Sequence, residues 1–177
     1  MTSTRHVVLV GLMGSGKTTV GMLLADRLDR TFVDNDVVLE SRTGQTAREI
    51  AAAAGADALH LREAEALVFA LSSNVAAVIA AAAAAPMEAF AAAVMSRHEV
   101  VYLRAPPTVL AARITRVPDD RHRPLVAGGA PGTLAAQLAA QFAARDERYR
   151  ALATLVVDAG VGGPEAVVDE ISSALAR

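Results

Sequence analysis

The chain has 177 residues, a formal net charge of −2 and no cysteine. This length suffices for one domain with a sizeable core, and the lack of cysteine excludes disulfide bonds and thiolate metal sites. A slightly acidic chain argues against nucleic-acid binding. The apolar run Val7–Val10 is too short for a signal peptide, and Pro86 and Glu88 interrupt the Ala-rich stretch Val75–Val94, which argues against a membrane span. We therefore expect a cytoplasmic protein without nucleic-acid or membrane partners.

Short apolar runs alternate along the chain with helical patterns, which favours an α/β fold with a parallel sheet covered on both faces. Strands are predicted at His6–Val10, Thr31–Asp34, Val75–Ala80, Glu99–Leu103 and Thr154–Asp158. Helices are predicted at Lys17–Asp29, Asp36–Arg42, Thr46–Ala54, Asp57–Ser72, Met87–Ser96, Pro107–Arg116, Pro131–Tyr149 and Pro164–Ala176. We expect a single domain over residues 1–177, with a mobile lid at about 116–132 because that segment is rich in Pro, Gly and charge.

The only lysine of the chain, Lys17, lies in a glycine-rich segment that follows the first predicted strand. Residues 11–18, GLMGSGKT, match the phosphate-binding loop pattern G-x-x-x-x-G-K-[ST]. A loop between strand and helix directs backbone N–H groups and the helix N-terminus at an anion. The alternative is a glycine-rich turn without a ligand, but strand, loop and helix occur in the required order. The candidate nucleotide-binding residues are therefore Gly11, Gly14, Ser15, Gly16, Lys17, Thr18 and Thr19.

A second polar group, Asp34-Asn35-Asp36, follows the second predicted strand. Ligands of parallel α/β sheets lie outside the carboxyl ends of the strands, so these carboxylates could share a pocket with the phosphate loop. One carboxylate could order the water shell of Mg²⁺, and the other could hold an acceptor hydroxyl and take its proton. The alternative is a helix cap, where Asp and Asn are favoured.

Arginine residues are the third group of candidates, because Arg can hold a carboxylate or phosphate with two parallel hydrogen bonds. Arg62 lies three residues before Glu65 on a predicted helix, so the two side chains can brace each other. Arg123 lies in the predicted lid, and Arg145 lies near the end of a long helix. Taken singly, each is more often a solvated surface residue. The four histidines show no metal-ligand spacing.

In combination these motifs resemble the shikimate kinase family. The resemblance rests on the phosphate loop with Thr19-Val20-Gly21, on Phe32–Asp36, Arg62-x-x-Glu65, Val101–Arg104, Arg123–Gly128 and Arg145, and on Arg148-Tyr149-Arg150. It covers nearly the whole chain in the order of the family. It implies a five-stranded parallel sheet of order 2-3-1-4-5 and transfer of the γ-phosphoryl group of ATP to the 3-hydroxyl of shikimate, with Mg²⁺. We also expect a monomer.

On the nucleotide side, the resemblance implies that Lys17 holds the β- and γ-phosphates and that Thr18 ligates Mg²⁺. Asp34 would serve the water shell of the metal. Arg123 would reach the transferring phosphate from the lid, and Arg116 would pack on adenine. Such an arrangement suits phosphoryl transfer, which depends on alignment and charge neutralisation more than on covalent chemistry.

On the acceptor side, the resemblance assigns the helices at about 36–72 to substrate binding. Asp36 would bind the acceptor hydroxyls and act as a base or orienting group. Arg62 and Arg145 would hold the substrate carboxylate. Three catalytic residues are thus implied: Lys17, Asp36 and Arg123.

One departure from the family follows the third predicted strand, where the family carries three glycines. The corresponding substrate-binding positions here are Ala82, Ala83 and Ala84. Glycine permits positive φ and close backbone approach, and a non-Gly residue forced into that conformation costs about 1–2 kcal/mol. Three alternatives follow: a shikimate kinase with a modified pocket, a kinase of another polyhydroxy acid or cyclitol such as gluconate, or an ATP-binding protein with impaired catalysis. The first is favoured because Asp36, Arg62 and Arg145 are present.

Overall fold

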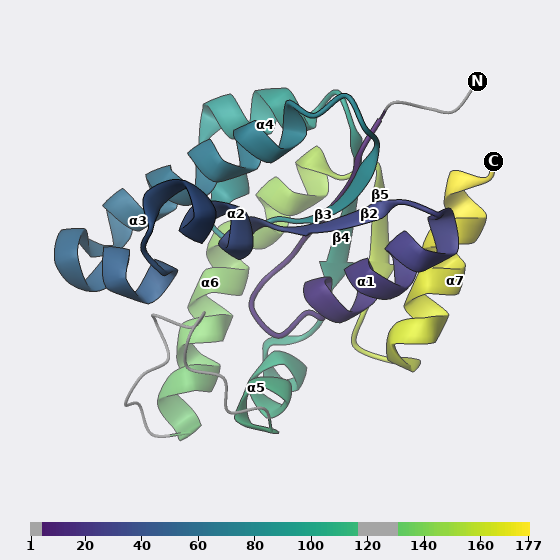
Figure 1. The fold of residues 1–177 in the computed structure, drawn as a ribbon. Coiled ribbons are helices and arrows are strands. Elements are labelled where there is room, and N and C mark those ends of the chain that lie inside the picture. Colours follow the sequence, from purple (N-terminus) through teal and green to yellow (C-terminus); the bar gives the residue numbers. More distant parts are fainter. Residues whose placement is uncertain (1–4, 117–130) are drawn as a thin grey trace.

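The computed structural model describes residues 5–116 and 131–177, in which five parallel strands form one sheet (Figure 1). The strand order is β2-β3-β1-β4-β5, as the family resemblance implied. The strands are β1 (Val7–Val10), β2 (Thr31–Asp34), β3 (Ala77–Ala80), β4 (Glu99–Arg104) and β5 (Leu155–Asp158). All five lie where the sequence predicted strands, within two residues at either end.

Helices connect the strands. They are α1 (Lys17–Leu28), α2 (Asn35–Thr43), α3 (Ala47–Leu71), a 3₁₀ turn η1 (Ala85–Met87), α4 (Ala89–Met95), α5 (Pro107–Arg116), α6 (Pro131–Leu152) and α7 (Gly163–Leu175). The two helices predicted at 46–54 and 57–72 together make up α3, and a kink at Gly55 (φ 86°, ψ 173°), which is not helical, separates them. Thr46 and Glu49 form a reciprocal capping box at the start of α3, which satisfies two backbone N–H groups.

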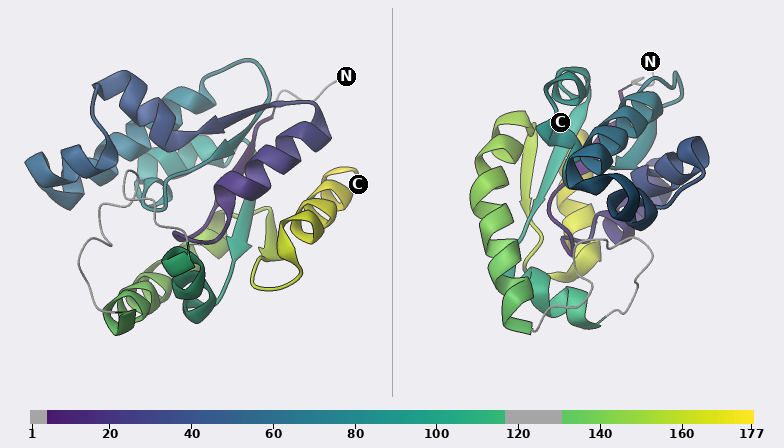
Figure 2. Two further views of the ribbon diagram at one scale, coloured as in Figure 1. Left: turned by 60° about the horizontal axis from the view of Figure 1, so that its bottom comes forward. Right: turned by 90° about the vertical axis from the view of Figure 1, so that its left-hand side faces the viewer.

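The sheet is buried on both faces, as continuous apolar strands require. Helices α1 and α7 lie side by side on one face, and their apolar side chains pack on one set of alternating strand residues. Helices α3, α4, α5 and α6 contribute to the core on the other face. Helices α5 and α6 pack against each other, and α6 continues from α5 along this face of the sheet (Figure 2). The sheet therefore forms the middle of three layers.

The Ala-rich stretch Val75–Val94 contributes β3, η1 and most of α4, as the sequence predicted for a strand, a turn and a helix. Among the residues that the structure describes, no helix is both long and apolar enough to cross a membrane.

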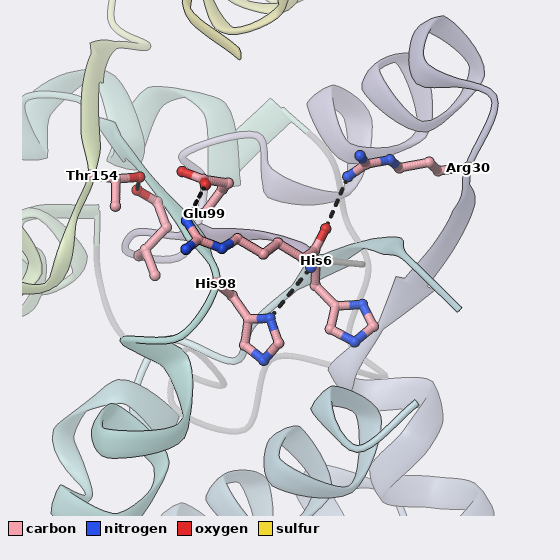
Figure 3. Close-up of polar contacts among 7 residues, drawn as sticks. His6, Arg30, His98, Glu99 and Thr154 are labelled. Atoms are coloured by element: carbon pink, nitrogen blue, oxygen red, sulfur yellow. Dashed lines mark hydrogen bonds and ion pairs between the residues drawn. The ribbon is translucent and has the colours of Figure 1, made fainter. Parts of the chain in front are cut away.

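The amino ends of the central strands meet at a pair of histidines (Figure 3). The buried ring of His6 accepts a hydrogen bond at Nδ1 from the Ala77 N–H (3.1 Å), and its Nε2 lies 3.0 Å from the Ser73 carbonyl oxygen. The His6 N–H donates to Nδ1 of His98 at 3.3 Å. Because Nδ1 of His6 is an acceptor here, the neutral ring carries its proton at Nε2 and donates to Ser73. The histidines thus tie the starts of β1, β3 and β4 together.

The opposite edge of the sheet carries the polar motifs. The parallel register pairs Asp34 at the end of β2 with Ala80 at the end of β3, and Ala80 with Leu9 of β1. The phosphate loop follows β1 directly, and the alanine segment follows β3. The fold therefore places the phosphate loop, the Asp34–Asp36 group and the alanine segment at one edge.

Candidate functional site

The phosphate loop has the backbone conformation of an anion cradle. Its glycines adopt left-handed φ values of 149° at Gly11, 81° at Gly14 and 94° at Gly16. A Cβ atom at Gly11 would lie 2.7 Å from the Leu103 carbonyl oxygen, so a side chain there would displace backbone. Lys17 Nζ donates to the carbonyl oxygens of Gly11 (2.9 Å) and Leu12 (3.2 Å). The lysine thus folds back across the loop that a phosphate would enter.

Lys17 lies in a strongly charged environment. Burial lowers its pKa, while the carboxylates of Asp36 and Asp34, and that of Glu63 when it is ionised, act to raise it. These acidic groups come from α2, β2 and α3, so three elements bring acidic side chains to the only lysine. The ammonium is therefore available to neutralise phosphate charge next to the acceptor groups.

The second polar group caps α2, so the capping alternative is confirmed for Asp34. One carboxylate oxygen of Asp34 accepts the Asp36 N–H at 3.0 Å, and the other accepts from the Thr18 hydroxyl at 3.1 Å. This geometry does not exclude a functional role, because it brings Thr18 and Asp34 together beside the phosphate loop. The residues described contain no cluster of three or more His, Asp or Glu side chains suited to a metal. Mg²⁺ commonly uses only one or two protein groups and completes its shell with water and phosphate oxygens.

The other nucleotide candidates lie in the phosphate loop, on α1 and on α5. Ser15 is buried in the loop, whereas Thr19 is exposed on the first turn of α1. Arg116 is exposed at the end of α5, which packs against the loop through Ile114 near Gly14. Arg123 and most of the predicted lid lie outside the described residues.

Arg62, one of the two predicted carboxylate ligands, is held on α3 by an acidic neighbour. Its guanidinium forms an ion pair with Glu65 at 2.9 Å, and 57% of its side-chain surface is exposed. The bracing predicted from the i, i+3 spacing is therefore confirmed.

Helix α3 also carries a buried acidic side chain, Glu63, which the sequence analysis did not select. Only 8% of Glu63 is exposed. Burial and the Asp36 carboxylate raise its pKa to about 8, while Arg145 and Lys17 act in the opposite direction. Glu63 thus lies within electrostatic range of the acceptor-side residues Asp36 and Arg145 and of the phosphate-loop lysine. The missed signal was its place in an apolar stripe with Leu59, Ala66 and Leu67, at helical spacing.

The alanine segment does not carry the strain that a glycine-requiring conformation would impose. Among the described residues, Asp29 is the only non-glycine with positive φ, so Ala82, Ala83 and Ala84 all avoid the left-handed region. Ala82 and Ala83 are half-buried and Ala84 is buried. The predicted cost of forced positive φ is therefore absent, and what remains is the space that the methyl groups occupy.

Helix α6 is fixed to the sheet by a polar network below Arg145. The carboxylate of Asp146 accepts hydrogen bonds from the Tyr102 hydroxyl (2.8 Å), from Arg104 (2.9 Å) and from Arg150 (2.8 Å). The rings of Tyr102 and Tyr149 lie 5.0 Å apart. Tyr102 and Arg104 belong to β4, whereas Asp146 and Arg150 belong to α6, so the network joins the helix that carries Arg145 to the sheet.

Comparisons with known proteins agree with this arrangement. The model of the family described as shikimate kinase matches residues 13–176. The chain belongs to the shikimate kinase family. A shikimate kinase from Chromohalobacter salexigens is 41% identical over 166 residues, covering 93% of this chain and 88% of that protein. Shikimate kinase 2 from Serratia proteamaculans is 34% identical over 173 residues, covering 97% of this chain and 96% of that protein.

Solved structures of related kinases have the same fold as this chain. Shikimate kinase from Acinetobacter baumannii in complex with shikimate superposes with a TM-score of 0.84 and 31% identity, covering 97% of this chain and 93% of that chain. A gluconokinase from Sinorhizobium meliloti has a TM-score of 0.66 at 18% identity, covering 98% and 93% of the two chains. The latter likeness is one of fold alone. The family uses ATP as its phosphoryl donor, and its members are phosphotransferases acting on a hydroxyl group.

Proposed function

We propose that the chain transfers the γ-phosphoryl group of ATP to the 3-hydroxyl of shikimate. The observation that carries the proposal is the convergence of Lys17, Asp36, Glu63 and Arg145 at the carboxyl edge of the sheet. A cation for phosphate, a carboxylate for a hydroxyl and a cation for a carboxylate are what a kinase of a hydroxy acid requires.

On the nucleotide side, phosphate oxygens compete with the carbonyl groups of Gly11 and Leu12 for the Lys17 ammonium. Backbone N–H groups of the loop and the start of α1 bind the same phosphates. The oxygen atoms of Thr18 and Asp34 are hard ligands that fit Mg²⁺, directly or through water. When bound, this metal neutralises charge on the phosphates. Arg123 from the lid and Arg116 against the adenine complete the proposed nucleotide site.

On the acceptor side, Asp36 at the start of α2 orients the acceptor hydroxyl and receives its proton. Its backbone is held by the cap to Asp34, so the carboxylate starts from a fixed position. Arg145 holds the substrate carboxylate with parallel hydrogen bonds. Arg62, whose guanidinium is braced by Glu65 at 2.9 Å, is the second proposed ligand of that carboxylate. We also propose that the protein acts as a monomer in the cytoplasm.

The experiment that tests the proposal is a coupled assay of ADP release with shikimate, quinate, gluconate or no acceptor. We expect turnover with shikimate, and no comparable turnover with the other acids. Lys17→Ala should remove phosphoryl transfer while leaving the circular dichroism spectrum and melting temperature close to those of the wild type. Efficient turnover with gluconate instead would identify a different acceptor, and acceptor-independent ADP release would indicate impaired transfer.

A further inference from the structure

Asn35, the residue between the two aspartates, is a fully buried amide with 0% of its surface exposed. Its Nδ2 donates a hydrogen bond to the Glu63 carbonyl oxygen at 3.1 Å. Because a carbonyl oxygen can only accept, this contact fixes which end of the amide faces α3. The other end, Oδ1, is buried without a hydrogen-bond partner among the described residues. A buried amide with one unpaired end costs stability, so folding alone would favour an apolar side chain here.

The hydrogen bond of Asn35 joins two elements that lie apart in the sequence. Asn35 is the first residue of α2, directly after β2, whereas Glu63 lies in the second half of α3. Asn35 and Leu39 are four residues apart, so they share one face of α2. On that face Leu39 is buried in a cluster with Ile50 and Leu59 of α3.

Helix α3 does not need this bond to satisfy its own backbone. The Glu63 carbonyl lies inside α3, where it accepts the helical N–H four residues further on. The amide of Asn35 is thus a second donor to an oxygen that already has a partner. What the bond adds is a fixed orientation of the first turn of α2 on α3.

Asp36, which follows Asn35, is held from the other side as well. Its N–H donates to Oδ1 of Asp34 at 3.0 Å, and Oδ2 of Asp34 accepts from the Thr18 hydroxyl at 3.1 Å. The first turn of α2 is therefore tied to the start of α1 through Asp34 and to α3 through Asn35. These two ties place Asp36 between the phosphate loop and the helices proposed for the acceptor.

We propose that Asn35 is a positioning residue for phosphoryl transfer, which holds the first turn of α2 on α3 and so keeps the Asp36 carboxylate aligned with the acceptor hydroxyl. This inference rests on the proposed function, since it names the residue that places Asp36. Asn35 is buried and touches neither substrate. Its loss should therefore lower kcat, because a misplacement of about 1 Å in the reacting complex slows the reaction, while ATP and shikimate bind almost as before.

The test compares kcat and both KM values for the wild type, Asn35→Leu, Asn35→Ala and Asn35→Ser. Leu has a branched side chain of similar size without a donor, so Asn35→Leu should fold with a melting temperature close to that of the wild type. Its kcat should fall about tenfold or more, with little change in either KM.

The Ala and Ser variants keep the test decisive if Asn35→Leu does not fold. They leave cavities of nearly equal size, but the Ser hydroxyl can donate to the Glu63 carbonyl directly or through a water. Asn35→Ser should therefore keep a higher kcat than Asn35→Ala. Equal kcat values in these two variants would count against the inference.

Ile171→Val is the control for stability. Ile171 is fully buried on α7, in the core on the opposite face of the sheet from α3, so the loss of one methylene lowers the melting temperature without reaching Asp36. We expect the wild-type kcat for this variant. A kcat that follows the melting temperature across all variants, Ile171→Val included, would show a merely structural role, and a wild-type kcat in Asn35→Leu would overturn the inference.

Failure of the proposed function has a separate signature, because it appears in the wild type rather than in the comparison of variants. If the wild type phosphorylates another hydroxy acid, kcat is measured with that acid, and an unchanged kcat in Asn35→Leu again rejects the inference. If the wild type transfers phosphate to no acceptor, both proposals are wrong.

Discussion

Tyr149, fully buried on α6, donates its phenolic hydrogen to the carbonyl oxygen of Ala83. Burial raises the pKa of Tyr149 to about 12, so the hydroxyl remains a donor throughout the physiological range. The bond joins the alanine segment after β3 to the helix that carries Arg145. This hydrogen bond therefore holds the alanine segment, which forms the wall of the proposed acceptor pocket, against α6, which carries the proposed carboxylate ligand Arg145.

Tyr149→Phe removes this donor and leaves the Ala83 carbonyl group without its partner. We expect a loss of about 1–3 kcal/mol in the free energy of unfolding, measured by urea denaturation. The shikimate KM should rise while the ATP KM stays nearly constant, because the phosphate loop does not depend on this bond. Thr154→Val, which removes a hydroxyl that donates to the Val100 carbonyl oxygen outside this network, is the matched control. Equal effects of the two variants on the shikimate KM would contradict the specific role of Tyr149.

Glu63 makes the free energy of unfolding fall as the pH rises. Its folded-state pKa, about 8, lies above the ordinary value of 4.5, so the folded protein holds this proton more tightly than the unfolded chain. The resulting stability is fully present below about pH 4.5 and is lost as the pH rises through 8. Glu63→Gln should abolish this loss, with a gain over the wild type on the order of a few kcal/mol at pH 9 and a smaller difference at pH 5. A difference between the two proteins that does not change with pH would exclude a neutral Glu63.

The histidine pair at the amino edge of the sheet gives the opposite response. Burial lowers the pKa of His98, and the positive charges of Arg5 and Arg97 act in the same direction, as does His6 when it is protonated. Its folded-state pKa lies below the unfolded value near 6.5, so this contribution is present above that pH and is lost as the pH falls below it. Protonation at Nδ1 would also remove the acceptor for the His6 N–H.

We therefore expect His98→Asn, which keeps an acceptor but cannot protonate, to lose less stability than the wild type between pH 7 and pH 5. Thermal melts of both proteins across this range are the measurement. Parallel pH profiles would show that His98 does not titrate with folding. Because the pair lies at the sheet edge away from the phosphate loop, the ATP KM should be unaffected.

Replacement of Ala82, Ala83 and Ala84 by glycine tests the role of the methyl groups. Since these residues avoid positive φ, glycine relieves no strain, and we expect a stability loss of about 0.4–1 kcal/mol per position from the looser unfolded chain. Removal of the methyl groups should nevertheless lower the shikimate KM through closer backbone approach. A lower melting temperature without a lower shikimate KM would show that the alanines do not restrict the pocket.

The sequence predicted most of this fold because its signals are local. The phosphate loop, the alternating apolar runs and the Asp34 cap each depend on a few neighbouring residues. Which side chains of α3 are buried toward the site could not be predicted from such local signals. Its bend at Gly55 and its packing on α2 set the rotation of the helix, and that rotation buries Glu63 while leaving Arg62 paired with Glu65. The i, i+3 spacing correctly predicted the ion pair between Arg62 and Glu65, but spacing does not tell which face of α3 carries that pair.

The identity of the phosphorylated product is the most direct test of the account. The wild type is incubated with ATP, Mg²⁺ and shikimate, and the product is examined by phosphorus and proton magnetic resonance. We predict phosphate on the 3-hydroxyl for the wild type and no product for Asp36→Asn, which should still bind ATP because its phosphate loop is intact. ADP formation without phosphorylated shikimate, or unchanged product formation by Asp36→Asn, would contradict the central claim.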